Sequence, residues 1–288
     1  MRITNQMMAD KIATQLFRQN EQMAKTQEQI VTGKRINRAS DDPSGISSVL
    51  SYRKTISSLE QYNENISNAK LHIDAVDNVL DMVTELLREA KEIAFDSAPD
   101  MRAQLAVDVA ELRDQVLQMA GYQIDGKYVF NGDSTNAAPY TGAPWTYAMD
   151  TGTKDVIIGD NLSIDIIADG SAIFGPNGNN VFNILDTLET ALNADDAPTI
   201  KAQVAQLGTA MDRIETVRTE NAVVYKRLEA TENHYAYFKV NVEEMLSKTE
   251  DADVAEAIVK FQVQQTSYES TLATSSMILQ KSLVDFLR

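Results

Sequence analysis

Cysteine is missing from this chain of 288 residues, and its absence excludes disulfide bonds, zinc–thiolate sites and cysteine nucleophiles. Long apolar runs are missing as well, since none reaches the roughly 20 residues of a membrane-spanning helix. The first residues also lack the apolar segment of a cleaved signal peptide. We therefore expect no membrane partner, and export without a cleaved signal peptide if the protein leaves the cell.

Histidine is scarce, and residue types that carry enzyme chemistry are not grouped. His72 and His234 are the only histidines, and neither lies at metal-ligand spacing from other ligand residues. The string from Gly121 to Tyr128 approaches a phosphate-binding loop, but Tyr128 occupies the position of the hydroxyl that would bind magnesium. We predict no catalytic residue, no metal site and no cofactor, and hence no enzyme.

Basic charge is also in short supply. The chain has 26 Lys and Arg against 42 Asp and Glu, a net charge of −16. Residues 1–40 differ, with seven basic and three acidic residues, but these charges are single and alternate with glutamine and an apolar stripe. Binding to phosphates needs clustered cations, so we expect no nucleic-acid partner and interpret the basic arm as a helix face that is solvated or complementary to acidic neighbours.

Glycine and proline are absent from residues 46–96 and 209–288, whereas residues 126–178 hold eight of the twelve glycines and three of the six prolines. This distribution predicts two helical arms around a middle segment rich in turns. The predicted fold is mainly α, an elongated rod of long antiparallel helices with a small β-rich insert.

Local signals mark the predicted helix ends. Gly33 suits the left-handed position after a first helix, while Asp42 and Pro43 suit the cap and first residue of a second. Asp253, followed by Glu256, resembles a capping box before the last helix. Helices are predicted over residues 4–32, 43–97, 105–119, 181–192, 198–245 and 254–287. Short strands are predicted at 128–130, 145–147, 156–158 and 162–168, with a hairpin turn at Asp169 and Gly170.

The first and last helices both show a heptad repeat, which is typical of helices that pair along their length. Polar residues such as Gln19, Thr26, Gln265 and Ser275 interrupt both stripes, so an isolated pair would bury too little apolar surface to offset its ordering entropy. We therefore predict terminal helices that form a coiled coil only on assembly. The predicted assembly seam consists of Ile12, Leu16, Met23, Ile30, Val254, Ile258, Phe261, Tyr268, Leu272, Leu279, Leu283 and Phe286.

Residues 29–45 read QIVTGKRINRASDDPSG and resemble the N-terminal signature of the bacterial flagellin superfamily. Residues 264–273 and 281–287 are similar to that superfamily's closing helix. The resemblance covers both arms and leaves the insert unmatched. The positions that carry the N-terminal signature are Thr32, Gly33, Arg35, Ile36, Asn37, Asp41, Asp42 and Pro43.

Two further strings separate branches of the superfamily. MRITNQMM at residues 1–8 and GKYVFNG at residues 126–132 resemble the branch found at the junction of hook and filament more than the filament subunits. The small insert also fits that branch. A flagellin filament subunit is the alternative, and a non-flagellar coiled-coil adaptor would explain the heptads but not the signature.

The resemblance implies a structural, extracellular part of the bacterial flagellum. It implies export in an unfolded state by the flagellar type III apparatus, with an export chaperone on the C-terminal helix, and self-assembly into a tubular ring between a hook-side junction protein and flagellin. It also implies three domains. Residues 1–41 and 251–288 would form an assembly domain that is disordered in the monomer, residues 42–130 and 180–250 a helical rod, and residues 131–179 an outer insert.

Overall fold

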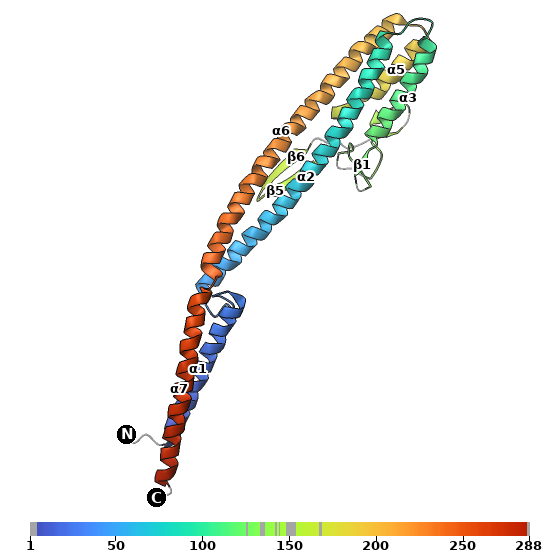
Figure 1. The fold of residues 1–288 in the computed structure, drawn as a ribbon. Coiled ribbons are helices and arrows are strands. Elements are labelled where there is room, and N and C mark those ends of the chain that lie inside the picture. Colours follow the sequence, from blue (N-terminus) through green and yellow to red (C-terminus); the bar gives the residue numbers. More distant parts are fainter. Residues whose placement is uncertain are drawn as a thin grey trace. The chain divides into compact units, whose positions relative to one another are not determined.

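The computed structural model describes residues 5–124, 126–132, 136–141, 143, 145–147, 154–166 and 169–286. Long helices dominate and a small β region lies between them (Figure 1), which confirms the predicted fold class. In chain order the elements are α1 (Asn5–Thr32), α2 (Pro43–Phe95), α3 (Arg102–Ala120), β1 (Gln123–Ile124), β2 (Lys127–Tyr128), β3 (Tyr140–Thr141), β4 (Thr146–Tyr147), β5 (Lys154–Gly159), β6 (Leu162–Ile166), α4 (Gly170–Phe174), α5 (Val181–Asn193), α6 (Ala197–Glu250) and α7 (Val254–Phe286).

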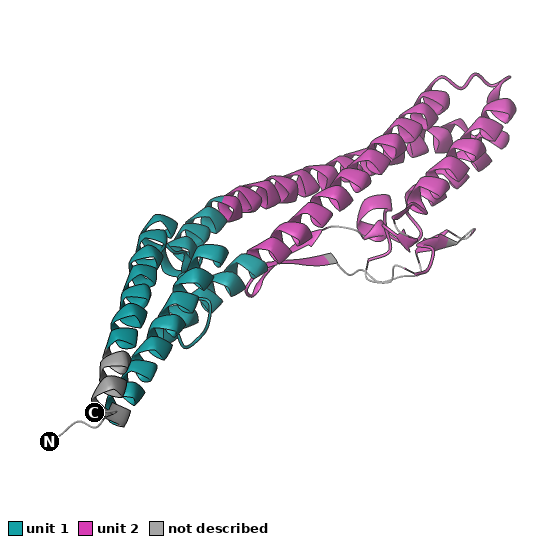
Figure 2. Ribbon diagram, turned by 60° about the horizontal axis from the view of Figure 1, so that its bottom comes forward, with its two compact units in different colours: residues 1–58, 237–288 teal, residues 59–236 magenta. Residues whose placement is uncertain are grey.

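The chain divides into two compact units (Figure 2). Unit 1 contains residues 1–58 and 237–288, and unit 2 contains residues 59–236. The helices α2 and α6 each contribute to both units. The three-domain division predicted from the sequence places its boundaries elsewhere and stays a prediction.

In unit 1, α1 and α7 lie side by side and run in opposite directions (Figures 1 and 2). The capping signals explain where these helices begin and end. Gly33 has a φ of +69°, which a residue with a side chain rarely adopts. Asp42 accepts a hydrogen bond from the Gly45 N–H at 2.9 Å and so caps α2, and Asp253 caps α7 by accepting one from the Glu256 N–H at 3.1 Å.

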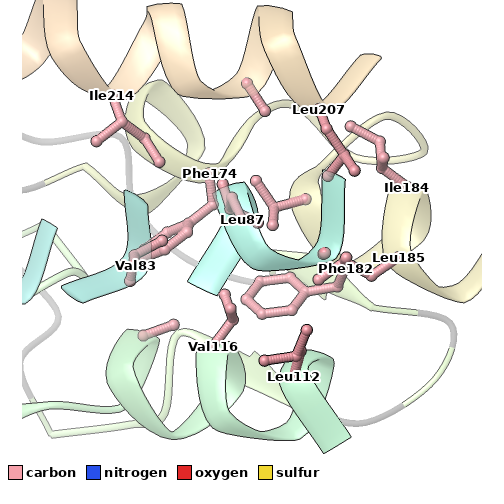
Figure 3. Packing of buried hydrophobic residues seen from close by; sticks show 14 of the residues in the cluster. Val83, Leu87, Leu112, Val116, Phe174, Phe182, Ile184, Leu185, Leu207 and Ile214 are labelled. Atoms are coloured by element: carbon pink, nitrogen blue, oxygen red, sulfur yellow. The ribbon is translucent and has the colours of Figure 1, made fainter. Parts of the chain in front are cut away.

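In unit 2, the largest hydrophobic core lies where α2, α3, α5 and α6 meet, as Figure 3 shows. Each helix contributes residues at intervals of three or four, the spacing of a buried helix face. Labelled members of this core are Val83, Leu87, Leu112, Val116, Phe174, Phe182, Ile184, Leu185, Leu207 and Ile214.

Aromatic residues from the segment between α3 and α5 complete this core. The rings of Tyr140 and Phe182 have their centroids 4.6 Å apart, and Trp145 stacks on Phe182 at 6.0 Å. The Tyr140 hydroxyl donates a hydrogen bond to the Gly170 carbonyl at 3.0 Å, and burial raises the pKa of this tyrosine. Part of the predicted insert is therefore joined to the helices by a shared core.

The strands of the described residues form three separate antiparallel pairs rather than one sheet. The pair β5–β6 packs Ile158, Ile164 and Ile166 against Ile66, Ile73 and Leu228 of α2 and α6. The strand prediction for residues 156–158 agrees with β5, and that for 162–168 agrees with β6 over its described residues. The prediction for 145–147 agrees with β4 at Thr146 and Tyr147 but not at Trp145. At residues 128–130 only Tyr128 is in a strand, and Ala168 lies outside the described residues.

The predicted hairpin turn at Asp169 and Gly170 is wrong. The Asp169 side chain accepts a hydrogen bond from the Ser171 N–H at 2.8 Å and caps the short helix α4. Asp followed by Gly occurs both in turns and before helices, because the aspartate side chain can accept backbone N–H hydrogen bonds in either setting. Gly170 is required for another reason, since an added Cβ would lie 2.7 Å from the Phe130 carbonyl oxygen.

Candidate assembly site

One face of α1 packs along α7, and the predicted α1 positions share it. Ile12, Leu16, Met23 and Ile30 are each half-buried on this face. The two polar positions between them, Gln19 and Thr26, are half-buried and buried, respectively. The structure therefore brings the α1 half of the predicted seam together in one stripe.

On α7 the structure divides the predicted seam. The positions with little exposure are spaced by four and three residues, and the stripe that they form is Ala257, Phe261, Gln264, Tyr268, Thr271 and Ser275. Only Phe261 and Tyr268 belong to the predicted set. Their neighbours in that set, Val254, Ile258 and Leu272, are 39%, 43% and 43% exposed. The side chains of Leu279, Leu283 and Phe286 lie outside the described part of the structure.

The contact between α1 and α7 has polar side chains at its middle, and its buried side chains are small. The Gln19 side-chain amide donates hydrogen bonds to the hydroxyls of Ser267 at 3.3 Å and Thr271 at 3.2 Å. Among the described side chains of these two helices, only Thr26, Ala257 and Ser275 are buried. Burial of large apolar side chains supplies most packing free energy, so this pair gains little from its own contact.

Large apolar side chains on both helices face solvent instead. Phe17 of α1 is 72% exposed, and Val263 and Met277 of α7 are 64% and 69% exposed. Val263 and Met277, together with Ile258 and Leu272, give α7 apolar residues on faces that α1 does not cover. Exposed apolar side chains that gather on one face are typical of surfaces that bind other proteins.

Residues 33–42, here named the signature loop, connect α1 to α2 and pack on the junction between α6 and α7. The Arg35 N–H donates to the Glu250 carbonyl at 2.6 Å, and the Ala252 N–H donates to the Gly33 carbonyl at 2.9 Å. The Arg35 guanidinium also donates to the Thr249 carbonyl at 2.7 Å. The loop thus ties the start of the chain to the start of the last helix.

Glu250 is the buried carboxylate of this junction. Its side chain is 4% exposed and forms ion pairs with Lys34, at 2.8 Å, and with Arg53 of α2. Glu250 belongs to none of the motifs in the sequence. Its place at the end of a helix is a usable signal, because an acidic residue there interacts unfavourably with the helix dipole and is stabilised by a nearby cation.

The two adjacent aspartates of the signature are structural. Asp41 accepts hydrogen bonds from the N–H groups of Asn37 at 3.2 Å and Arg38 at 3.0 Å, and its ion pair with Lys25 spans 2.8 Å. The hydrogen bond from Lys25 is the main cause of a lowered pKa at Asp41. At Asp42, the hydrogen bond from the Gly45 N–H is the main cause of a lowered pKa. Both groups therefore favour the charged form and hold the loop.

The remaining signature residues close the loop around Ile36, which is 2% exposed. The Asn37 side-chain amide donates to the Lys34 carbonyl at 3.0 Å, and the Thr32 hydroxyl donates to the Glu28 carbonyl at 2.8 Å. Pro43 is the first residue of α2. Gly45 leaves room for Ile36, since an added Cβ would lie 2.7 Å from the Ile36 Cδ1 atom.

The described residues include no group of three or more His, Cys, Asp or Glu side chains placed to hold a metal ion. Within the same residues, none of the helices has both the length and the apolar character needed to cross a membrane.

Comparison with known proteins agrees with the family resemblance of the signature. Residues 3–135 match the family model of the bacterial flagellin N-terminal helical region. The N-terminal arm is therefore similar to a flagellin N-terminal helical region. The resemblance to the flagellin superfamily is thereby confirmed.

Relatives extend this match to nearly the whole chain. The flagellar hook-associated protein 3 of Escherichia coli is 27% identical over 94% of this chain and 95% of its own length. The flagellin of Bacillus subtilis is 26% identical over 91% of this chain and 90% of its own length. A solved flagellar hook-associated protein from Vibrio parahaemolyticus, 19% identical, has the same fold, with a TM-score of 0.68 over 73% of this chain and 100% of that one. These relatives are structural proteins of the flagellum.

Proposed function

We propose that this chain is a junction protein that joins the flagellar hook to the flagellin filament. The observation that carries the proposal is the match to hook-associated protein 3 along nearly the full length of both chains. The string at residues 126–132 and the small insert, which resemble the junction branch, add support. Its role is structural and non-enzymatic, and its place is outside the cell.

The terminal helices give this function a physical mechanism. The α1–α7 pair buries only small side chains among those described, while Ile258, Val263 and Leu272 of α7 are exposed. In a tubular ring, neighbouring subunits cover these apolar faces, so folding of the ends is coupled to polymerisation. A hook-side junction protein and flagellin adjoin the ring, and an export chaperone covers the C-terminal helix before assembly.

Electron microscopy of a strain without this protein tests the function. The expected result is hooks that carry no filaments, together with flagellin shed into the culture medium. Loss of filaments without shed flagellin would instead identify the chain as the filament subunit, as the name of its Bacillus subtilis relative, flagellin, suggests. Normal filaments on the mutant cells would reject both roles.

Limited proteolysis tests whether the ends of the free chain are ordered. In dilute solution we expect trimming of α1 and α7, because exposed, weakly packed helices open most readily. The resistant body should run from about residue 33 to about residue 252, since the signature loop is held to Glu250 and Ala252 by hydrogen bonds and by the Lys34 ion pair. Mass spectrometry of the products and light scattering of the starting sample give the boundaries and the oligomeric state. Resistant, intact termini in a proven monomer would contradict this expectation.

A further inference from the structure

A buried polar residue interrupts the contact between α2 and α6 in unit 2. Asn221 of α6 is 2% exposed, and both the Oδ1 and the Nδ2 atom of its side chain are buried. Neither atom has a hydrogen-bond partner among the described residues. An amide removed from water without a partner costs free energy, so its position calls for an explanation.

Asn221 lies between two separate hydrophobic clusters. On one side, Val76 and Val217 belong to the large core. On the other, Ile73 and Leu228 belong to the smaller cluster beneath β5 and β6. Because Asn221 follows Val217 by four residues and precedes Val224 by three, it occupies the position where a continuous helical seam would place an apolar side chain.

A pocket lies directly beside Asn221. The pocket of about 210 Å³ is lined by Asn221 together with Ile73, Asp77, Arg218 and Tyr225, a volume several times that needed for one water molecule. Arg218 spans the two helices beside it, since its Nε donates to Asp77 at 2.8 Å and its Nη1 lies 3.1 Å from Asp81. The Asn221 amide atoms are closed off from this pocket in the packed helices, and a small separation of α2 and α6 would bring water to them.

We infer that Asn221 forms a polar notch in the α2–α6 packing, where the two helices open locally and admit water to the amide more readily than on either side. The notch divides unit 2 into two cohesive halves and allows a local change in helix packing without loss of either core. Water satisfies the Asn221 amide in the opened state, and the Arg218–Asp77 pair limits the separation of the helices across the notch. The inference is independent of the proposed flagellar function.

Hydrogen exchange on the wild-type chain tests the notch directly. Peptides covering residues 72–77 and 219–223 should exchange about tenfold faster than peptides covering residues 79–87 and 207–214, because local opening sets the exchange rate of helical amides. Uniform protection along both helices would overturn the inference. This measurement needs no variant.

Substitution of Asn221 provides a second, independent readout. Asn221→Leu should fill the seam, raise the melting temperature by about 2–4 °C and slow exchange at the notch to the rate of its flanks. Asn78→Leu is the matched control, because Asn78 is an exposed asparagine on α2 in the same region, and it should change neither quantity. An Asn221→Leu chain that melts earlier than wild type, or fails to fold, would show that the amide supports the packing and would overturn the inference.

Discussion

Replacing Leu272 with aspartate should abolish incorporation of the chain into the flagellum and leave the free chain folded. Leu272 is 43% exposed on α7 and lies outside the stripe that faces α1. In the free chain the new carboxylate therefore remains in water, and we expect a melting temperature within about 2 °C of wild type. In the ring it would be buried against apolar neighbours, at a cost that no contact there offsets.

The experiment expresses Leu272→Asp in a strain that lacks the natural chain, and scores filaments by electron microscopy and motility by spreading in soft agar. Leu272→Met should restore filaments, because it keeps an apolar side chain of similar volume. Thr274→Asp adds the same charge at an exposed polar position and should retain most filaments and most of the motility. Normal filaments with Leu272→Asp would contradict an apolar contact at this face.

Helix ends were predictable because single residues decide them. Gly33, Asp42 with Pro43, and Asp253 each act within one turn of backbone, and the structure places helix ends at all three. The start of α3 was less well predicted, since the structure begins it at Arg102, three residues before Leu105. Met101 precedes α3 without a side-chain cap, so no local signal marked that end.

The face of α7 that α1 covers in the single chain was only half predictable. The sequence of α7 offers two overlapping heptad stripes, one through Phe261, Tyr268 and Ser275 with Gln264 and Thr271, and one through Ile258 and Leu272. Periodicity alone favours the more apolar choice. In the structure α1 covers the smaller and more polar stripe, because its Gln19 pairs with Thr271. Which stripe is covered depends on the side chains of the partner helix, and the sequence of α7 alone does not contain that information.

The signature loop illustrates what a motif leaves out. The motif named Asp41 and Asp42, whose partners Lys25, Arg38 and Gly45 are close in sequence. Glu250 meets Lys34 across more than 200 residues, so only the folded chain brings the pair together. The aromatic core of unit 2 was hidden for the same reason, because Tyr140, Trp145 and Phe182 come from separate short segments.

The ion pairs of Glu250 predict a second large effect, on stability. Removing the two cations should destabilise unit 1 more than removing the carboxylate charge. Lys34→Met combined with Arg53→Met leaves a carboxylate whose side chain is 4% exposed without either of its ion-pair partners. We expect this double variant to lose about 3–5 kcal/mol in the free energy of unfolding of unit 1. Glu250→Gln should lose only about 1–2 kcal/mol, because Lys34 and Arg53 can turn into water.

Urea unfolding of all variants, followed by circular dichroism and by hydrogen exchange of residues 33–42, measures both losses. Lys54→Met is the control for Arg53, since Lys54 is the adjacent, exposed cation of α2, and it should change the free energy of unfolding little. Adding Glu250→Gln to the double variant should recover most of its loss, because the uncompensated charge is then gone. A larger loss from Glu250→Gln alone than from removal of both cations would show that Glu250 acts through its packing and not through its buried charge.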